Sequence, residues 1–162
     1  MATIVNSSPL IFLARLKWLE QAIRTFDVLF LPQAVADEIA VKNDEAARAV
    51  QTAIASKQLV VRQTTLRLLA QQLQQRLGKG ESEAIALAVE LQAERIILDD
   101  HAARKEALRL GLNVRGTLAI IRQLHTQGII RIISSDDLYR MLASVHFRIK
   151  RHLVEEIFSD LK

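Results

Sequence analysis

Residues 78–100 read GKGESEAIALAVELQAERIILDD, and this stretch decides the fold. Glycines at its start break the preceding segment, and the alanine-rich run at 81–92 has the composition of a helix. Residues 95–98 then form a short β-rich run that ends in two aspartates, Asp99 and Asp100. A helix that leads directly into a strand indicates an α/β fold, in which helices connect parallel strands.

The same alternation of short β-rich runs and longer helical segments continues through the chain. Strands are expected at residues 3–5, 28–31, 59–62, 95–98 and 112–115, with a further edge strand at 129–133. Helices are expected to begin near residues 9, 32, 44, 64, 81, 101, 117, 134 and 151, the first of them extending to about residue 26. This order predicts βαβ units and an α/β fold with a mainly parallel sheet of roughly five strands.

Length and hydrophobic content predict one domain. The chain has 162 residues, and half of them are hydrophobic, which provides a substantial core. We expect a single domain over residues 1–162, of which about 134–162 form a C-terminal helical extension. The last expected helix, about 151–161, is amphipathic and carries Leu153, Ile157 and Leu161 in one stripe.

Composition excludes several kinds of chemistry. Cysteine is absent, so disulfides, thiol nucleophiles and Cys-ligated zinc are excluded. Aromatic residues make up 4% of the chain, which argues against a stacking platform for single-stranded bases. The first apolar run is cut by Arg15 and Lys17, and no positive segment precedes it, so we expect a soluble, cytoplasmic protein with no membrane partner. The net charge of +4 favours polyanionic partners, although ordinary solubility explains it as well.

Acidic and amide residues recur where strands end or helices begin. Asn6 follows the first expected strand, and Asp99 and Asp100 follow the fourth. Ligands bind outside the carboxyl ends of the strands of an open parallel sheet, so these side chains are expected at one functional edge. The alternative is that Asn6 and Asp100 serve only as helix caps. On the helix that begins at about residue 32, spacing does not decide between Asp37 and Glu38 as a further candidate.

Two glutamates of the 81–92 helix differ in their predicted surroundings. Helical spacing places Glu81 on the apolar face, so we interpret it as an inward-facing carboxylate. The alternative for Glu81 is that it complements the helix dipole at the first turn. Glu83 falls in line with Glu90 and Glu94, on a stripe that is expected to face solvent.

Several stretches form a recognisable series when they are taken in order. They are Asn6-Ser7-Ser8-Pro9-Leu10-Ile11, the helix with Glu38, Gly78-Lys79-Gly80-Glu81-Ser82-Glu83-Ala84-Ile85-Ala86-Leu87-Ala88, Ile97-Leu98-Asp99-Asp100, Gly116-Thr117-Leu118 and His146-Phe147-Arg148-Ile149. This series resembles the PIN domain (PilT N-terminus) family, and in particular an uncharacterised PIN-like branch related to VapC-type toxin ribonucleases. The resemblance covers nearly the whole chain.

The resemblance implies a three-layer α/β/α sandwich and a site for Mg²⁺ or Mn²⁺. Hard cations of this kind take oxygen ligands. The implied ligand positions fall on Asn6, Glu38, Glu81 and Asp100, with Asp99 beside the last of them. Ser8 matches the hydroxyl residue of the family, and Glu83 and Thr117 are implied as supporting residues.

The function that the resemblance implies is a divalent-metal-dependent endoribonuclease. Its catalytic carboxylates are Glu38, Glu81, Asp99 and Asp100, its substrate is RNA, and its implied partners are an inhibitory antitoxin and a second copy in a homodimer. Two positions depart from the family, because Asn6 and Glu81 both stand where the family has Asp. The charge lost at Asn6 corresponds to roughly 4 kcal/mol of gross attraction per unit-charge pair at 4 Å. A catalytically weak or inactive module that binds nucleic acid or protein is therefore the alternative.

Basic residues near the implied site suggest where RNA phosphates would lie. Arg104, Lys105 and Arg109 follow the acidic turn and are candidates for phosphate contacts, although a solvated helix face explains them equally well. A second basic cluster, at 148–152, is interpreted as binding nucleic acid or a partner. The leucine-rich segment at 66–77 fits either an interface or ordinary core packing.

Overall fold

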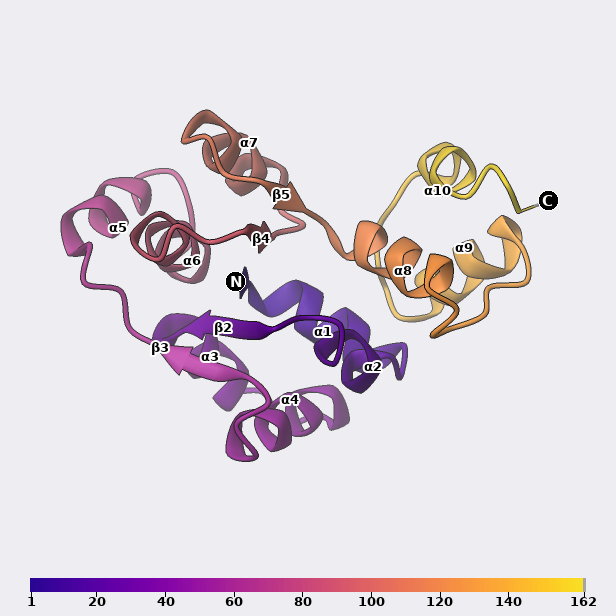
Figure 1. Ribbon diagram of the computed structural model, residues 1–162, viewed down its shortest axis with the longest axis horizontal. Coiled ribbons are helices and arrows are strands. Elements are labelled where there is room, and N and C mark those ends of the chain that lie inside the picture. Colours follow the sequence, from indigo (N-terminus) through magenta and orange to yellow (C-terminus); the bar gives the residue numbers. More distant parts are fainter. Residues whose placement is uncertain (162) are drawn as a thin grey trace.

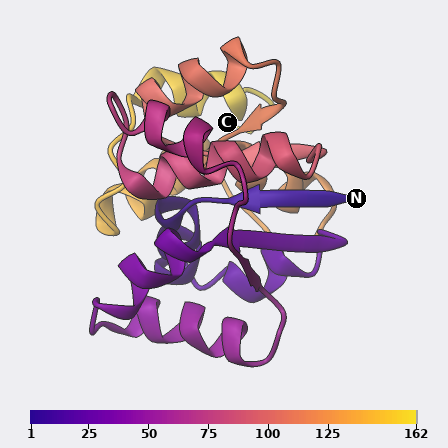
Figure 2. The same cartoon turned by 90° about the vertical axis from the view of Figure 1, so that its left-hand side faces the viewer.

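The computed structural model describes residues 1–161 and contains one parallel sheet (Figure 1). Its strands are β1 (Ala2–Val5), β2 (Val28–Pro32), β3 (Val60–Arg62), β4 (Arg95–Ile97) and β5 (Val114–Arg115). They lie in the order β3-β2-β1-β4-β5, and every neighbouring pair is parallel. Figure 2 shows β1 and β2 running side by side in the same direction, with Ala2 opposite Val28. The predicted α/β fold is therefore confirmed, with a sheet that is wholly parallel.

Helices connect the strands and cover both faces of the sheet. They are α1 (Ser7–Arg15), α2 (Leu19–Ile23), α3 (Gln33–Ala40), α4 (Glu45–Ala55), α5 (Arg67–Leu73), α6 (Lys79–Glu90), α7 (His101–Arg109), α8 (Thr117–Thr126), α9 (Ser135–Ser144) and α10 (Arg151–Ile157). Figure 1 shows α5, α6 and α7 on one side of the sheet and α1, α2 and the C-terminal helices on the other. This arrangement is the three-layer sandwich.

Successive residues of the central strands explain why both faces are covered. In β1, Ile4 packs into the core beneath α5, α6 and α7, whereas Val5 packs into the core beneath α1 and α8. Ile96 and Ile97 of β4 divide in the same way between the two cores. Side chains alternate across a strand, so a strand that is apolar at every position must be buried on both faces.

The first long helix predicted at 9–26 is two helices. The chain turns at Lys17, whose φ of 66° lies in the left-handed region, and α2 begins two residues later. The amide of Trp18 donates to the carbonyl of Leu13 and closes α1. The turn between the two helices lets α2 pack against the core, where Leu19 and Ile23 are buried.

The edge strand predicted at 129–133 is wrong. Gly128, with a φ of 72°, ends α8, and the amides of Ile129 and Ile130 both donate to the carbonyl of Leu124. The amide of Ile132 donates to Nδ1 of His125. Backbone groups that a strand would use for pairing are thus committed to the end of the helix.

The C-terminal helices pack into the main core, and of the predicted stripe Leu161 is packed against it. Leu153 and Ile157 of α10 remain 39% and 40% exposed, whereas Val154 and Phe158 are fully buried. Val154 and Phe158 join the cluster that contains Leu138 of α9 and residues of α1 and α8. The division into a domain body and a C-terminal extension stays a prediction. Within residues 1–161, no helix is long and apolar enough to cross a membrane.

Candidate functional site

The candidate site lies where the order of the strands reverses. From β1 the chain proceeds to β2 on one side, whereas β4 lies on the other side of β1. The amide of Asn6 donates to the carbonyl of Ile97 at 3.1 Å, which ties the carboxyl ends of β1 and β4 together. Asn6 follows β1 directly, and Asp99 and Asp100 follow β4 after one intervening residue. A reversal point of this kind is the usual ligand-binding place of an open α/β sheet.

Asn6 and Glu38 converge over a glycine. A Cβ added at Gly80 would collide with Oε1 of Glu38 and would lie 3.4 Å from Oδ1 of Asn6. The Ser7 hydroxyl donates to Oε2 of Glu38 at 2.9 Å and fixes the carboxylate in this place. The neighbouring Asp37 is exposed and accepts a hydrogen bond from Gln33 instead. Spacing did not decide between Asp37 and Glu38, and in the structure it is Glu38 that lies beside Asn6.

The amide oxygen of Asn6 is buried and unsatisfied. Asn6 is only 3% exposed, and its Oδ1 accepts no hydrogen bond from any group in residues 1–161. Buried polar atoms are nearly always paired, because an unpaired one costs roughly 1–3 kcal/mol. An unpaired oxygen beside a carboxylate is the arrangement that a bound cation would satisfy.

Asp99 is held by the start of α8. Its two carboxylate oxygens accept from Thr117, one from the amide at 2.8 Å and one from the hydroxyl at 2.5 Å. Burial raises the pKa of Asp99 above its ordinary value, while the Thr117 hydrogen bonds and the charge of Arg104 act in the opposite direction. Arg104 is placed by a hydrogen bond from its guanidinium to the carbonyl of Leu98 at 2.8 Å. Thr117 therefore orients this carboxylate.

Asp100 differs from its neighbour. It is exposed, and one of its oxygens accepts from the amide of Ala103 at 2.9 Å, so it caps α7. The predicted capping role is thus real, and it uses a single oxygen of the carboxylate. Both oxygens of Asp99 are engaged by Thr117, so Asp100 has more freedom to contact a ligand.

A groove of about 1000 Å³ opens beside these residues. Its acidic part consists of Glu81, Asp99 and Asp100, and Ser8 also lines it. Its remaining walls are basic or apolar: Phe12, Arg104, Leu118, Ala119, His146, Phe147, Arg148, Ile149, Lys150, His152, Leu153 and Ile157. Acidic and basic side chains therefore face the same groove.

The predicted ligands fall into two sets. Asn6 and Glu38 form the buried pair, and Glu81, Asp99 and Asp100 line the groove. In the part of the chain that the structure describes, no three His, Cys, Asp or Glu side chains lie close enough together to hold a metal ion. Mg²⁺, however, keeps several waters and uses only one or two carboxylates of the protein. The oxygen donors and the unsatisfied Asn6 fit such a hydrated ion.

Glu83 and Glu90 do not form the solvent stripe that spacing indicated. Glu83 is half-buried and accepts from the amide of Ala34, at the start of α3. Glu90 accepts from the hydroxyl of Thr64 and the amide of Thr65, each at 2.7 Å. The hydrogen bond from Thr64 is the main cause that lowers the pKa of Glu90. Both glutamates hold neighbouring segments of backbone in place.

The basic residues predicted after the acidic turn separate along α7. Arg104 lines the groove beside Asp99. Arg109 instead forms an ion pair with Glu106, which also binds Arg76. Lys105 is exposed and does not line the groove. Only Arg104 of the three is brought to the site.

Two features of the site are not evident from sequence reasoning. Ser7, rather than Ser8, carries the hydroxyl that binds Glu38. Its burial at the start of α1 is a tertiary effect, and the two adjacent serines give no signal that separates them. The basic C-terminal segment reaches the groove through His146, Arg148 and Lys150, although the chain places it far from the acids.

Comparison with known proteins returned one finding about family. A family model described as a PIN domain matches residues 2–162. A search of curated proteins returned no match.

Proposed function

The chain belongs to the PIN-domain family, whose fold is of nuclease type, and we propose that it is a divalent-metal-dependent endoribonuclease that hydrolyses RNA phosphodiester bonds. The observation that carries the proposal is the buried, unsatisfied Oδ1 of Asn6, which lies beside the carboxylate of Glu38. PIN domains are generally divalent-metal dependent, and this pair would hold Mg²⁺ or Mn²⁺. Such an ion, when bound, supplies positive charge for the reacting phosphate and activates the attacking water.

The side chains of the protein would share the remaining work. Ser7 keeps the Glu38 carboxylate turned towards Asn6, and Thr117 keeps Asp99 at the edge of the groove. Asp100 and Glu81 extend the acidic lining to the place where a phosphate would lie. We assign Glu38, Glu81, Asp99 and Asp100 to metal binding and catalysis, with Asn6 as a neutral ligand. Arg104, which lies beside Asp99, would contact the same phosphate.

RNA cleavage tests the proposal. The purified protein is incubated with a pool of structured RNAs in Mn²⁺, in Mg²⁺ and in chelator, beside Glu38→Gln and Asp100→Asn. Asp37→Asn is the matched control, because Asp37 lies on the same helix, is exposed and loses the same charge. Metal-dependent cleavage that both site variants lose and the control keeps is the expected result. No cleavage by folded wild-type protein in either metal would refute it.

One observation favours a second function. Asn6 supplies no charge, and in the described residues no three acidic or histidine side chains lie close enough together to hold a metal ion. A PIN-like module that binds RNA without cutting it has the same groove and basic wall. RNA affinity that is unchanged by chelator and by Glu38→Gln, in the absence of cleavage, would support this function.

Partners are proposed on the likeness to VapC-type toxins alone. By that likeness, the protein would assemble as a homodimer and bind an inhibitory antitoxin. Leu68 of α5 is 76% exposed, whereas Ala70 and Leu73 of the same helix are buried, so one apolar side chain of the leucine-rich segment is available for contact. Light scattering of the purified protein, beside Leu68→Gln, measures its mass in solution. A monomer at micromolar concentration would contradict the homodimer.

A further inference from the structure

The segment between α9 and α10 is a fixed ridge rather than a loose tail. Residues 146–150, here called the ridge, begin where His146 adopts a φ of 63°. The amide of His146 donates to Ala143 and the amide of Phe147 to Leu142, which is the hydrogen-bond pattern of a Schellman motif. The turn at the end of α9 therefore sets the direction of the ridge.

Both ends of the ridge are anchored in the fold. At one end the Phe147 ring packs edge-on against Phe12 of α1, with ring centres 4.8 Å apart. At the other end, Lys150 precedes α10, which is held by the buried Val154 and Phe158. A segment with two such anchors has a fixed backbone path, so only its side chains need to be ordered when a ligand binds, which lowers the entropy cost of binding.

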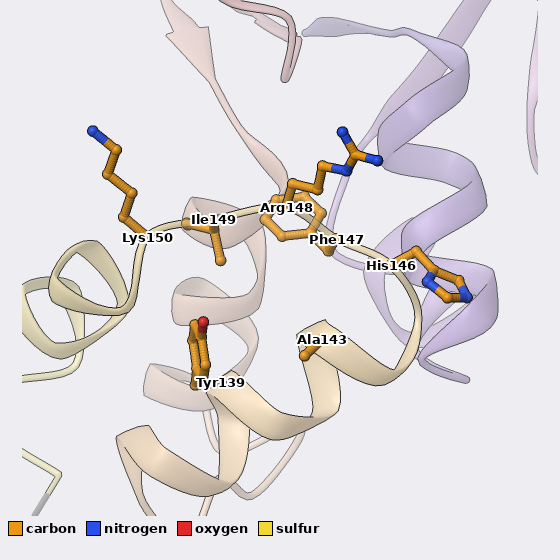
Figure 3. Close-up of a pocket in the computed structure, with 7 residues that line it drawn as sticks. All are labelled: Tyr139, Ala143, His146, Phe147, Arg148, Ile149 and Lys150. Atoms are coloured by element: carbon orange, nitrogen blue, oxygen red, sulfur yellow. The ribbon is translucent and has the colours of Figure 1, made fainter.

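Side chains alternate along the ridge. Phe147 and Ile149 are half-buried, whereas Arg148 and Lys150 are exposed. Figure 3 shows Arg148 and Lys150 projecting from one side of the ridge, while Ile149 points towards Tyr139 on the other. The ridge thus separates two hollows: the groove with the acidic residues, and a second hollow of about 830 Å³ lined by Tyr139 and Ala143.

Arg148 and Lys150 carry charges that the protein does not neutralise. Among the ion pairs of residues 1–161, none includes either side chain. Arg151, the next cation, is committed to Asp136 and lies over the Tyr139 ring. The ridge contains no acidic residue. Its two unpaired basic side chains lie beside a groove with three acids. This arrangement suits an RNA strand whose phosphates contact the basic side chains while one phosphate reaches a metal ion bound at the acids.

We propose that Arg148 and Lys150 are positioning residues that bind backbone phosphates of the RNA next to the one that is cut. The proposal rests on the proposed function for the identity of its ligand. Phosphate contacts fix the register of a nucleic acid without reading its sequence. The ridge would therefore hold the RNA strand in the groove, while the acids of the same groove act on one phosphate.

Salt-dependent RNA binding tests this assignment. A fluorescent single-stranded RNA of about twelve nucleotides is titrated in chelator, at several salt concentrations, with wild-type protein and with the double variant Arg148→Gln/Lys150→Gln. The control is Lys42→Gln/Lys57→Gln, which removes the same charge from exposed positions that do not line either hollow. Each phosphate contact contributes about −0.7 to the slope of log affinity against log salt for a single strand.

The expected result is a slope shallower by about 1.4 in the ridge variant and unchanged in the control. Over a fourfold rise in salt, the wild type should lose about 7-fold more affinity than the ridge variant. In a cleavage assay, the ridge variant should have a higher KM than the wild type and nearly the same kcat. The single variant Arg148→Lys, which keeps the charge, should bind RNA more tightly than the ridge variant.

Two outcomes would overturn the assignment. Equal losses in the ridge and control variants would show a general charge effect. Wild-type RNA affinity in the ridge variant would exclude RNA and leave the exposed charges to a protein partner. The failure of this assignment and the failure of the proposed function give different results. A ridge variant that binds and cuts RNA as the wild type does would refute only the role of the ridge. A wild-type protein that binds RNA through the ridge but never cuts it would refute only the nuclease activity.

Discussion

Gly80→Ala is expected to damage metal binding much more than it damages the fold. Gly80 is buried in the first turn of α6, and an added Cβ would displace the Glu38 carboxylate from its place beside Asn6. Alanine favours a helix by up to about 1 kcal/mol over glycine. Loss of the Ser7 hydrogen bond to a charged acceptor costs about 1.5–3 kcal/mol. The net loss of stability should therefore be about 0.5–2 kcal/mol.

The effect on metal binding is measured by thermal unfolding with and without Mn²⁺. A ligand at a hundred times its Kd stabilises a protein by about 2.7 kcal/mol. In a protein of this size 1 kcal/mol corresponds to about 2–4 °C, so the wild type should gain about 5–10 °C. Tenfold weaker binding in Gly80→Ala removes about 1.4 kcal/mol, or about 3–6 °C of that gain.

A control of similar stability separates the two effects. Ile121→Val removes one methyl group from a fully buried side chain of α8 and should cost about 0.5–1.5 kcal/mol. This variant should melt at a lower temperature but keep the full gain from Mn²⁺. If Gly80→Ala also keeps the full gain, Glu38 does not bind the ion beside Gly80 and the reasoning fails.

Three further changes probe the supports of the site and of the ridge. Thr117→Val removes the hydroxyl that donates to Asp99 and should cost about 1–3 kcal/mol in urea unfolding at neutral pH; an unchanged midpoint would contradict the orienting role. Phe158→Ala empties a fully buried position and should cost about 3–5 kcal/mol by the same assay, so a smaller loss would mean that α10 is not anchored there. Asp160 has a pKa held below its ordinary value, chiefly by the hydrogen bond from Arg122, so Asp160→Asn should destabilise the protein at neutral pH. The difference from wild type should fade as the pH falls below about 3.9 through the lowered pKa; a difference that persists there would contradict the assignment.

The layers of the fold are predictable because local signals agree with one another. The alanine-rich run before Arg95 is predicted only as a helix, and the apolar run that begins at Arg95 only as a strand. They form α6 and β4, respectively. The prediction of a strand at residues 129–133 was wrong because apolar character alone does not show which acceptors the backbone amides bond to. The amides of Ile129, Ile130 and Ile132 bond to Leu124 and His125 at the end of α8 instead.

The site was harder to predict because its contacts are long-range. Spacing alone left Asp37 and Glu38 equivalent, and the choice between them depends on Ser7 and on the close approach of Gly80. Glu83 has the spacing of a solvent-facing residue, yet the neighbouring α3 covers it and supplies a backbone donor. Such contacts join segments more than thirty residues apart, so periodicity within one helix does not reveal them.

Calorimetric titration of Mn²⁺ into wild type, Asn6→Asp and Glu38→Gln tests the cation site most directly. The added charge of Asn6→Asp should tighten binding, because it restores an anion beside Glu38. Glu38→Gln should abolish binding, whereas Asp37→Asn should bind as wild type. Equal Mn²⁺ affinity in wild type, Asn6→Asp and Glu38→Gln would contradict a cation at this edge of the sheet.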